Sequence, residues 1–267
     1  MRIYGVDFTC APRRAKPITV AGGVLKKKTL HLERLERLAS FDEFEALLRR
    51  PGPWIGGFDL PFALPAELVQ DLGWPSDWKT LVGHCAGFSR EQFRRALDAY
   101  RASRPPGRKY AHRATDLPAG SSSPMKLVNP PVALMFHEGA RRLLAAGVHV
   151  PALADGDPQR VALEAYPGLL VRKQLGVRIS YKSDTRAQHT PARTAARRQI
   201  LNALLEGKPL GIRLKTGKSL QQAMIRDGSA DLLDATICAV QAAWASSRPR
   251  YGFPPQAFEG EGWIVSA

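Results

Sequence analysis

Five acidic residues on separate segments could carry out chemistry in this chain. Three of them, Asp7, Asp59 and Glu164, stand at the ends of short apolar runs. The other two, Asp231 and Asp234, are separated by three positions where a helix is expected to begin. Carboxylates brought together cannot all stay ionised without cations, and oxygen ligands with open positions suit Mg²⁺ or Mn²⁺. We therefore predict that all five are catalytic residues and ligands of one of these ions.

The chemistry that this group predicts is metal-dependent hydrolysis of a phosphodiester. Two ions a few ångströms apart would activate a water molecule and stabilise the leaving oxygen. In this scheme Asp7 bridges both ions, Asp59 and Glu164 hold one side, and Asp231 or Asp234 holds the other.

Lys182 is the predicted catalytic cation, which would neutralise a non-bridging phosphate oxygen. No step needs a nucleophilic serine or cysteine. The sequence contains no GxSxG, P-loop or HExxH motif that would indicate another chemistry.

Each acid except Glu164 also has a purely structural interpretation. Asp7 and Asp59 each precede a chain break and could form turns with the backbone that follows. Asp231 and Asp234 could simply stabilise the positive end of a helix dipole. The layout of strand, acid and break recurs, and the dipole gives no reason to place two acids on one side of a helix, so the functional interpretation is favoured.

The segments that must position these acids indicate an α/β protein. The run MRIYGVDFTC is apolar on both faces, as expected of a central strand, and an acid at the carboxyl end of a parallel strand faces the crevice where α/β folds keep their sites. Further strands are predicted at residues 18–24, 28–32, 54–62, 160–166 and 262–265, the first two forming an antiparallel meander with the first run, while residues 31–37 could be strand or helix. Helices are predicted at residues 40–50, 65–73, 89–100, 132–146, 191–205 and 229–246.

This order of elements predicts an interrupted core. Residues 1–62 and 157–267 would form the core, and residues 63–156 a mainly helical and loop insertion. The length of 267 residues is enough for one core with a sizeable insertion.

The charge favours a polyanionic partner, most often nucleic acid. Lysine and arginine number 39 against 24 acidic residues, which gives a net charge of +15. The stretch 104–126 is rich in Pro, Gly and Ser and is predicted to be a mobile loop, whose cations could hold a phosphate backbone or could simply be solvated. Together with Lys182, the predicted nucleic-acid-binding residues are Arg104, Arg108, Lys109 and Arg113.

Other features favour a cytoplasmic protein without a membrane partner. No apolar run is long enough to cross a bilayer, and the first residues lack the features of a signal peptide. The three cysteines lie far apart, so we expect neither disulfides nor a zinc site.

Five motifs also give a family resemblance. The sequence resembles the domain-of-unknown-function 429 family of predicted nucleases with the RNase H-like fold. The resemblance implies a mixed central sheet flanked by helices, with a first-strand Asp, a fourth-strand acid and acids on the last helix, as in metal-dependent nucleases and resolvases. The insertion after the fourth strand is not part of that core. The matching motifs are GVDFTCAP around Asp7, GFDLPF around Asp59, EAYPGLL around Glu164, YKSDT around Lys182 and DLLDATICAV around Asp231 and Asp234.

Two other function classes fit parts of the sequence. A protein with the same fold could bind nucleic acid without turnover. An actin-like kinase or phosphatase is a third interpretation, because GVDFTCAP faintly resembles the GxDxGT phosphate loop of that fold. Its second phosphate loop and Gly-rich adenosine segment are not found in the sequence. The sequence does not distinguish DNA from RNA or specify an oligomeric state.

Overall fold

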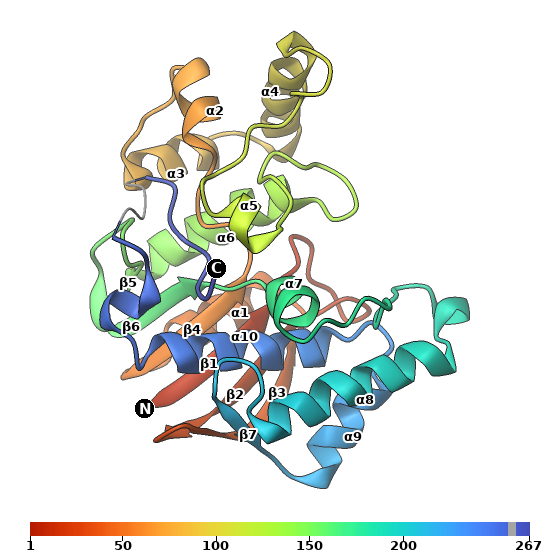
Figure 1. The fold of residues 1–267 in the computed structure, drawn as a ribbon. Helices are drawn as coiled ribbons and strands as arrows, with labels where there is room; N and C mark the ends of the chain where they lie inside the picture. Colours follow the sequence, from red (N-terminus) through yellow and green to blue (C-terminus); the bar gives the residue numbers. More distant parts are fainter. Residues whose placement is uncertain (256–259) are drawn as a thin grey trace.

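The computed structural model describes residues 1–255 and 260–267. Within these residues a seven-stranded mixed sheet has the order β5-β6-β4-β1-β2-β3-β7 (Figure 1). The predicted α/β class and the antiparallel meander of β1, β2 and β3 are confirmed, and residues 31–37 are strand. The strands are β1 (Arg2–Asp7), β2 (Ile18–Lys26), β3 (Thr29–Leu38), β4 (Trp54–Asp59), β5 (Val148–His149), β6 (Asp157–Glu164) and β7 (Arg213–Lys215).

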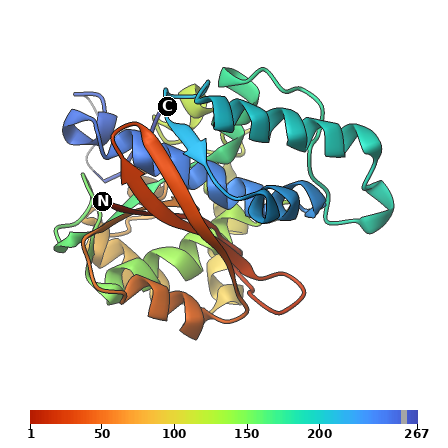
Figure 2. The same ribbon diagram turned by 90° about the horizontal axis from the view of Figure 1, so that it is seen from below.

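Helices cover both faces of the sheet (Figure 2). Side chains alternate along β1, so that Ile3 packs into the apolar cluster beneath α10, while Tyr4 and Val6 pack into the cluster on the opposite face. α10 lies against β1, β4 and β2, and α8 and α9 extend the same layer. The helices of this layer are α8 (Pro191–Glu206), α9 (Lys218–Arg226) and α10 (Asp231–Ala245).

The opposite layer combines α1 with the helices of the predicted insertion. Capping boxes begin α1 at Ser40 and α4 at Ser89, as the sequence predicts. Phe44 of α1, Phe93 of α4 and Phe136 of α6 belong to one apolar cluster with β1 and β4. These helices are α1 (Phe41–Leu48), α2 (Ala66–Asp71), α3 (Trp78–Ala86), α4 (Arg90–Ser103), α5 (Asp116–Ala119) and α6 (Val132–Ala146).

The remaining segments are short. The strand predicted at residues 262–265 is reduced to an isolated parallel bridge between Ile264 and Glu164, next to the end of β6. Among the described residues, no helix is long and apolar enough to cross a membrane. The short helices are α7 (Pro167–Leu169), the π-helix η1 (Leu170–Gln174) and the 3₁₀-helices η2 (Arg186–Gln188) and η3 (Pro249–Gly252).

Candidate functional site

Asp7 and Asp59 lie side by side at the carboxyl ends of β1 and β4. The strands are parallel and the two acids are register partners, so their side chains leave the same face of the sheet. Both residues are partly buried, and both line a cavity of about 700 Å³ at the strand ends. The convergence predicted from the repeated strand-and-acid layout therefore holds for this pair.

Glycines two residues before each acid let α10 approach the sheet. A Cβ atom on Gly5 would lie 2.0 Å from the carbonyl oxygen of Ala235, and one on Gly57 would lie 2.5 Å from that of Cys238. Because strand side chains alternate, Gly5 shares with Asp7 the face that α10 covers. The Gly-x-Asp pattern, seen in both GVD and GFD, is the sequence signal for this packing, and sequence reasoning missed it.

α10 contributes Asp234 from its first turn. This aspartate is fully buried; Tyr181 donates a hydrogen bond to its Oδ1 at 2.6 Å, and Lys182 Nζ donates to its Oδ2 at 2.5 Å. Burial opposes the charge of Lys182, but Asp234 and Tyr181 outweigh that effect and hold the pKa of Lys182 well above its usual value. The predicted catalytic lysine is therefore held in its charged form beside Asp234.

Asp231 is paired with a cation that sequence reasoning missed. Lys16 Nζ lies 3.2 Å from both carboxylate oxygens of Asp231 and 2.7 Å from Oδ1 of Asp184. Burial raises the pKa of Asp231, whereas Lys16 lowers it. Lys16 follows β1 in an irregular loop, and no spacing marks it; only the fold brings it to α10.

Glu164, the third strand-end acid, lines the same cavity but leaves the opposite face of the sheet. It is the register partner of Phe58 and not of Asp59, and a shift of one residue along a strand turns a side chain to the opposite face. There Arg113 holds both oxygens of Glu164 at 2.6 and 2.7 Å, and the backbone N–H of Phe62 donates to it at 2.9 Å. We therefore correct the predicted metal ligand set by removing Glu164.

Arg113 is an interior residue and not a surface contact. It is 2 % exposed and also pairs with the fully buried Asp116 at 2.9 Å. Ala111 and Met125 nearby belong to the main apolar cluster, so much of the predicted mobile loop is packed. We therefore remove Arg113 from the predicted nucleic-acid contacts.

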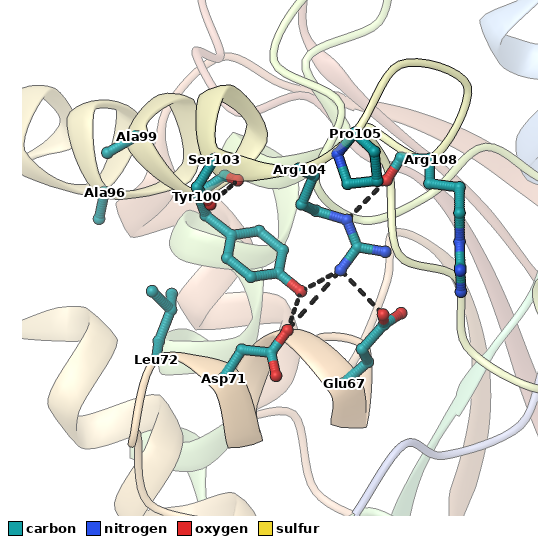
Figure 3. A pocket seen from close by; sticks show the side chains of 10 residues that line it. All are labelled: Glu67, Asp71, Leu72, Ala96, Ala99, Tyr100, Ser103, Arg104, Pro105 and Arg108. Carbon is teal, nitrogen blue, oxygen red and sulfur yellow. Dashed lines mark hydrogen bonds and ion pairs between the residues drawn. The ribbon is translucent and has the colours of Figure 1, made fainter.

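Two other cations of this stretch are also engaged within the chain. The Arg104 guanidinium lies 2.9 Å from Glu67 and also contacts Asp71 and the hydroxyl of Tyr100 in an open hollow beside α4 (Figure 3). Lys109 donates to the carbonyl of Arg104 at 2.6 Å, near the end of α4.

Arg108 keeps an exposed side chain. In Figure 3 it points away from the Arg104 guanidinium, and only its backbone carbonyl accepts a hydrogen bond there. Of the four cations predicted in this stretch, Arg108 is therefore the one that the structure leaves available for a phosphate.

The acids differ in how their charge is balanced. Asp234, Asp231 and Glu164 each pair directly with a cation. No such pair or hydrogen bond is formed with the carboxylate of Asp7 or Asp59 among the described residues, although the charge of Lys182 lowers the pKa of both from a greater distance. Burial, followed by repulsion from Asp231 and Asp234, raises the pKa of Asp7 well above its usual value. Burial likewise raises the pKa of Asp59 to about 7.

The same surroundings keep the nearest thiol neutral. Cys238 is fully buried on α10, and burial, with the charges of Asp59 and Asp7 added, raises its pKa well above the usual value. A nucleophilic thiolate is therefore not available here.

The pair Asp7 and Asp59, called the strand-end pair below, suits a hard divalent cation that takes only one or two of its ligands from the protein. Among residues 1–255 and 260–267, no group of three or more His, Cys, Asp or Glu side chains is arranged to hold a metal ion, so the predicted five-acid centre is not formed. Mg²⁺, however, is often bound through one or two carboxylates, with water and substrate phosphates as its other ligands. Asp7 and Asp59, which lack any donor, fit that role.

Comparison with known proteins places the chain in a family. A family model described as "Protein of unknown function (DUF429)" matches residues 5–257. The chain belongs to this family. No curated protein and no solved structure matches it significantly. The DUF429 match includes Asp7, Asp59 and α10, so every element of the site described above lies within the family region.

Proposed function

We propose that this DUF429 protein hydrolyses phosphodiester bonds of nucleic acid with the help of Mg²⁺ or Mn²⁺. The observation that carries the proposal is the pair Asp7 and Asp59, two neighbouring carboxylates that face a cavity without a cation of their own. A divalent cation would resolve their mutual repulsion, and an anionic substrate would complete its coordination.

Each side chain has a separate part in this proposal. Asp7 and Asp59 would hold one ion, which when bound supplies a Lewis acid for the phosphate and acidifies the attacking water. Asp234 and Tyr181 orient Lys182, whose ammonium group would neutralise a non-bridging phosphate oxygen. Glu164 instead fixes Arg113 in the cavity wall.

Topology supports the RNase H-like part of the proposal. β1 is central and ends in Asp7, the fourth strand of the chain ends in Asp59, and α10 carries Asp231 and Asp234. These are the placements that the family resemblance implies. The net charge of +15 supports a nucleic-acid partner, and the three free, buried cysteines support the reducing cytoplasm as its location.

A cleavage assay tests the proposal directly. Wild-type protein is incubated with single-stranded, duplex and branched DNA and RNA, with Mg²⁺, Mn²⁺ or EDTA. We expect metal-dependent products that Asp7→Asn and Asp59→Asn reduce at least about 100-fold. Asp155→Asn is the matched control, because that aspartate is fully exposed. Absence of metal-dependent product from every substrate would count against the proposal.

A binding protein without turnover is the second candidate. It is favoured by the pairing of three predicted ligands with Lys16, Lys182 and Arg113. This function requires salt-sensitive nucleic-acid binding that is unchanged by Asp7→Asn and unaffected by EDTA, without cleavage under any condition above.

A further inference from the structure

We propose that the cavity at Asp7 and Asp59 accepts unpaired nucleotides of a single strand, and that Lys126 binds a phosphate of that strand. The choice of strand rests on the proposed function, because it concerns the same cavity. Lys126 has no role in the sites described above.

The carboxylates of Asp7 and Asp59 lie in a cavity at the strand ends. A volume of about 700 Å³ is that of a pocket for a small ligand, and it holds a nucleotide or two more readily than a segment of double helix. The cavity walls come from the loop after β1, from residues 121–135, from the turn after β6 and from residues 182–184. Enzymes that must enclose a nucleotide in a pocket act on single strands or on nucleotides extruded from the stack.

Two of these walls are joined by hydrogen bonds. Arg172, on η1, donates a hydrogen bond to the carbonyl of Gly120 at 3.1 Å, and Lys173 donates to that of Pro118. Both bonds link the segment after β6 to the end of α5. This link narrows the approach to the cavity on one side, which favours a single strand over the wider double helix.

Lys126 lies in the cavity wall. Unlike the other cations of the wall, its side chain has no partner among the described residues. Its backbone is fixed, since its N–H donates to Ser123 and its carbonyl accepts from Ala133 at 3.0 and 2.9 Å. The neighbouring Met125 and Leu127 are buried. Lys126 is therefore held in the wall with its ammonium group free for an anion.

Two exposed apolar side chains flank the cavity in sequence without being part of its lining. Val128 is 60 % exposed and lies beside Asn129 in the wall, and Ile179 is 62 % exposed and precedes Lys182 by three residues. Such side chains suit the faces of unstacked bases, which a double helix keeps inside. They complement the phosphate contact expected of Lys126.

Binding without turnover tests the inference first. Fluorescence anisotropy in EDTA compares a labelled 20-nucleotide mixed-sequence single strand with the blunt duplex of the same strand, over a range of salt concentrations. We expect the single strand to bind at least about 10-fold more tightly. Lys126→Ala should weaken that binding about 5-fold and reduce the salt slope by about 0.7, the value for one phosphate contact on a single strand.

Arg198→Ala is the matched control, since Arg198 is exposed on α8, outside the cavity, and has no ion pair among the residues described. Equal effects of Lys126→Ala and Arg198→Ala would overturn the role of Lys126. Val128→Ser alone should also weaken single-strand binding, but it should leave the salt slope unchanged.

Cleavage of the same two substrates with Mn²⁺ separates this inference from the proposed function. Cutting of the single strand alone supports both. Equal binding and cutting of the duplex overturns the inference and leaves the nuclease proposal intact. Tight single-strand binding without cleavage overturns the nuclease proposal and supports the inferred ligand of the cavity.

Discussion

Three strand ends of this sheet share one sequence layout, but the charge of the acid is balanced differently at β6 than at β1 and β4. At β1 and β4, Asp7 and Asp59 lie on one face. Neither has an ion-pair partner among residues 1–255 and 260–267. At β6, Glu164 meets Arg113 and Asp116 in a closed, hydrogen-bonded group. The difference teaches that an acid at the end of a strand is available for a ligand only where no cation of the chain already holds its carboxylate.

The largest effect is expected where the paired group is broken. Arg113→Met would leave the carboxylates of Glu164 and Asp116 buried without a cation, so we expect the free energy of unfolding to fall by about 3–5 kcal/mol. Urea denaturation measures it. Arg108→Met is the control, since that side chain is exposed, and its effect should stay within about 0.5 kcal/mol. A small loss for both variants would show that the Arg113 group is not a structural one.

An intermediate effect is expected where α10 touches the sheet. Gly5→Ala places a methyl group 2.0 Å from the Ala235 carbonyl, so the helix that carries Asp234 must move. We expect a loss of about 1–3 kcal/mol together with weaker metal binding. Gly83→Ala, in α3 with open space around it, should stabilise the chain by about 0.5–1 kcal/mol. Unchanged stability and metal affinity in Gly5→Ala would contradict the close approach of α10.

A smaller effect concerns pH. The pKa of Asp59 rises from 3.8 to about 7 on folding. The folded chain therefore holds the proton more tightly, and the free energy of unfolding falls as pH rises between these values. In EDTA, Asp59→Asn should flatten this slope and stabilise the protein at pH 8 by on the order of 1 kcal/mol, allowing for solvent screening. Denaturation curves at pH 4 to 8 measure the slope; an unchanged slope would show that Asp59 ionises normally.

The fold was largely predictable because its signals are local. The capping boxes at Ser40 and Ser89 and the apolar run of β1 each follow from a few neighbouring residues. The prediction of a strand at residues 262–265 was wrong, because that stretch forms only one isolated bridge, between Ile264 and Glu164.

The site was predictable only in part, because register and pairing are not local. Sequence patterns placed five acids at element ends, but they did not show that Arg113 would hold the carboxylate of Glu164. Lys16 contacts Asp231 across more than 200 residues of chain, and Arg113 contacts Glu164 across more than 50. No spacing in the sequence predicts such contacts.

Metal binding tests the central claim most directly. Isothermal titration of the metal-free protein with Mn²⁺ at pH 8 should show binding that Asp7→Asn and Asp59→Asn abolish and that Glu164→Gln preserves, with the fold of each variant checked by denaturation. Loss of binding in Glu164→Gln, or equal binding by wild type and Asp7→Asn, would contradict a cation site at the strand-end pair.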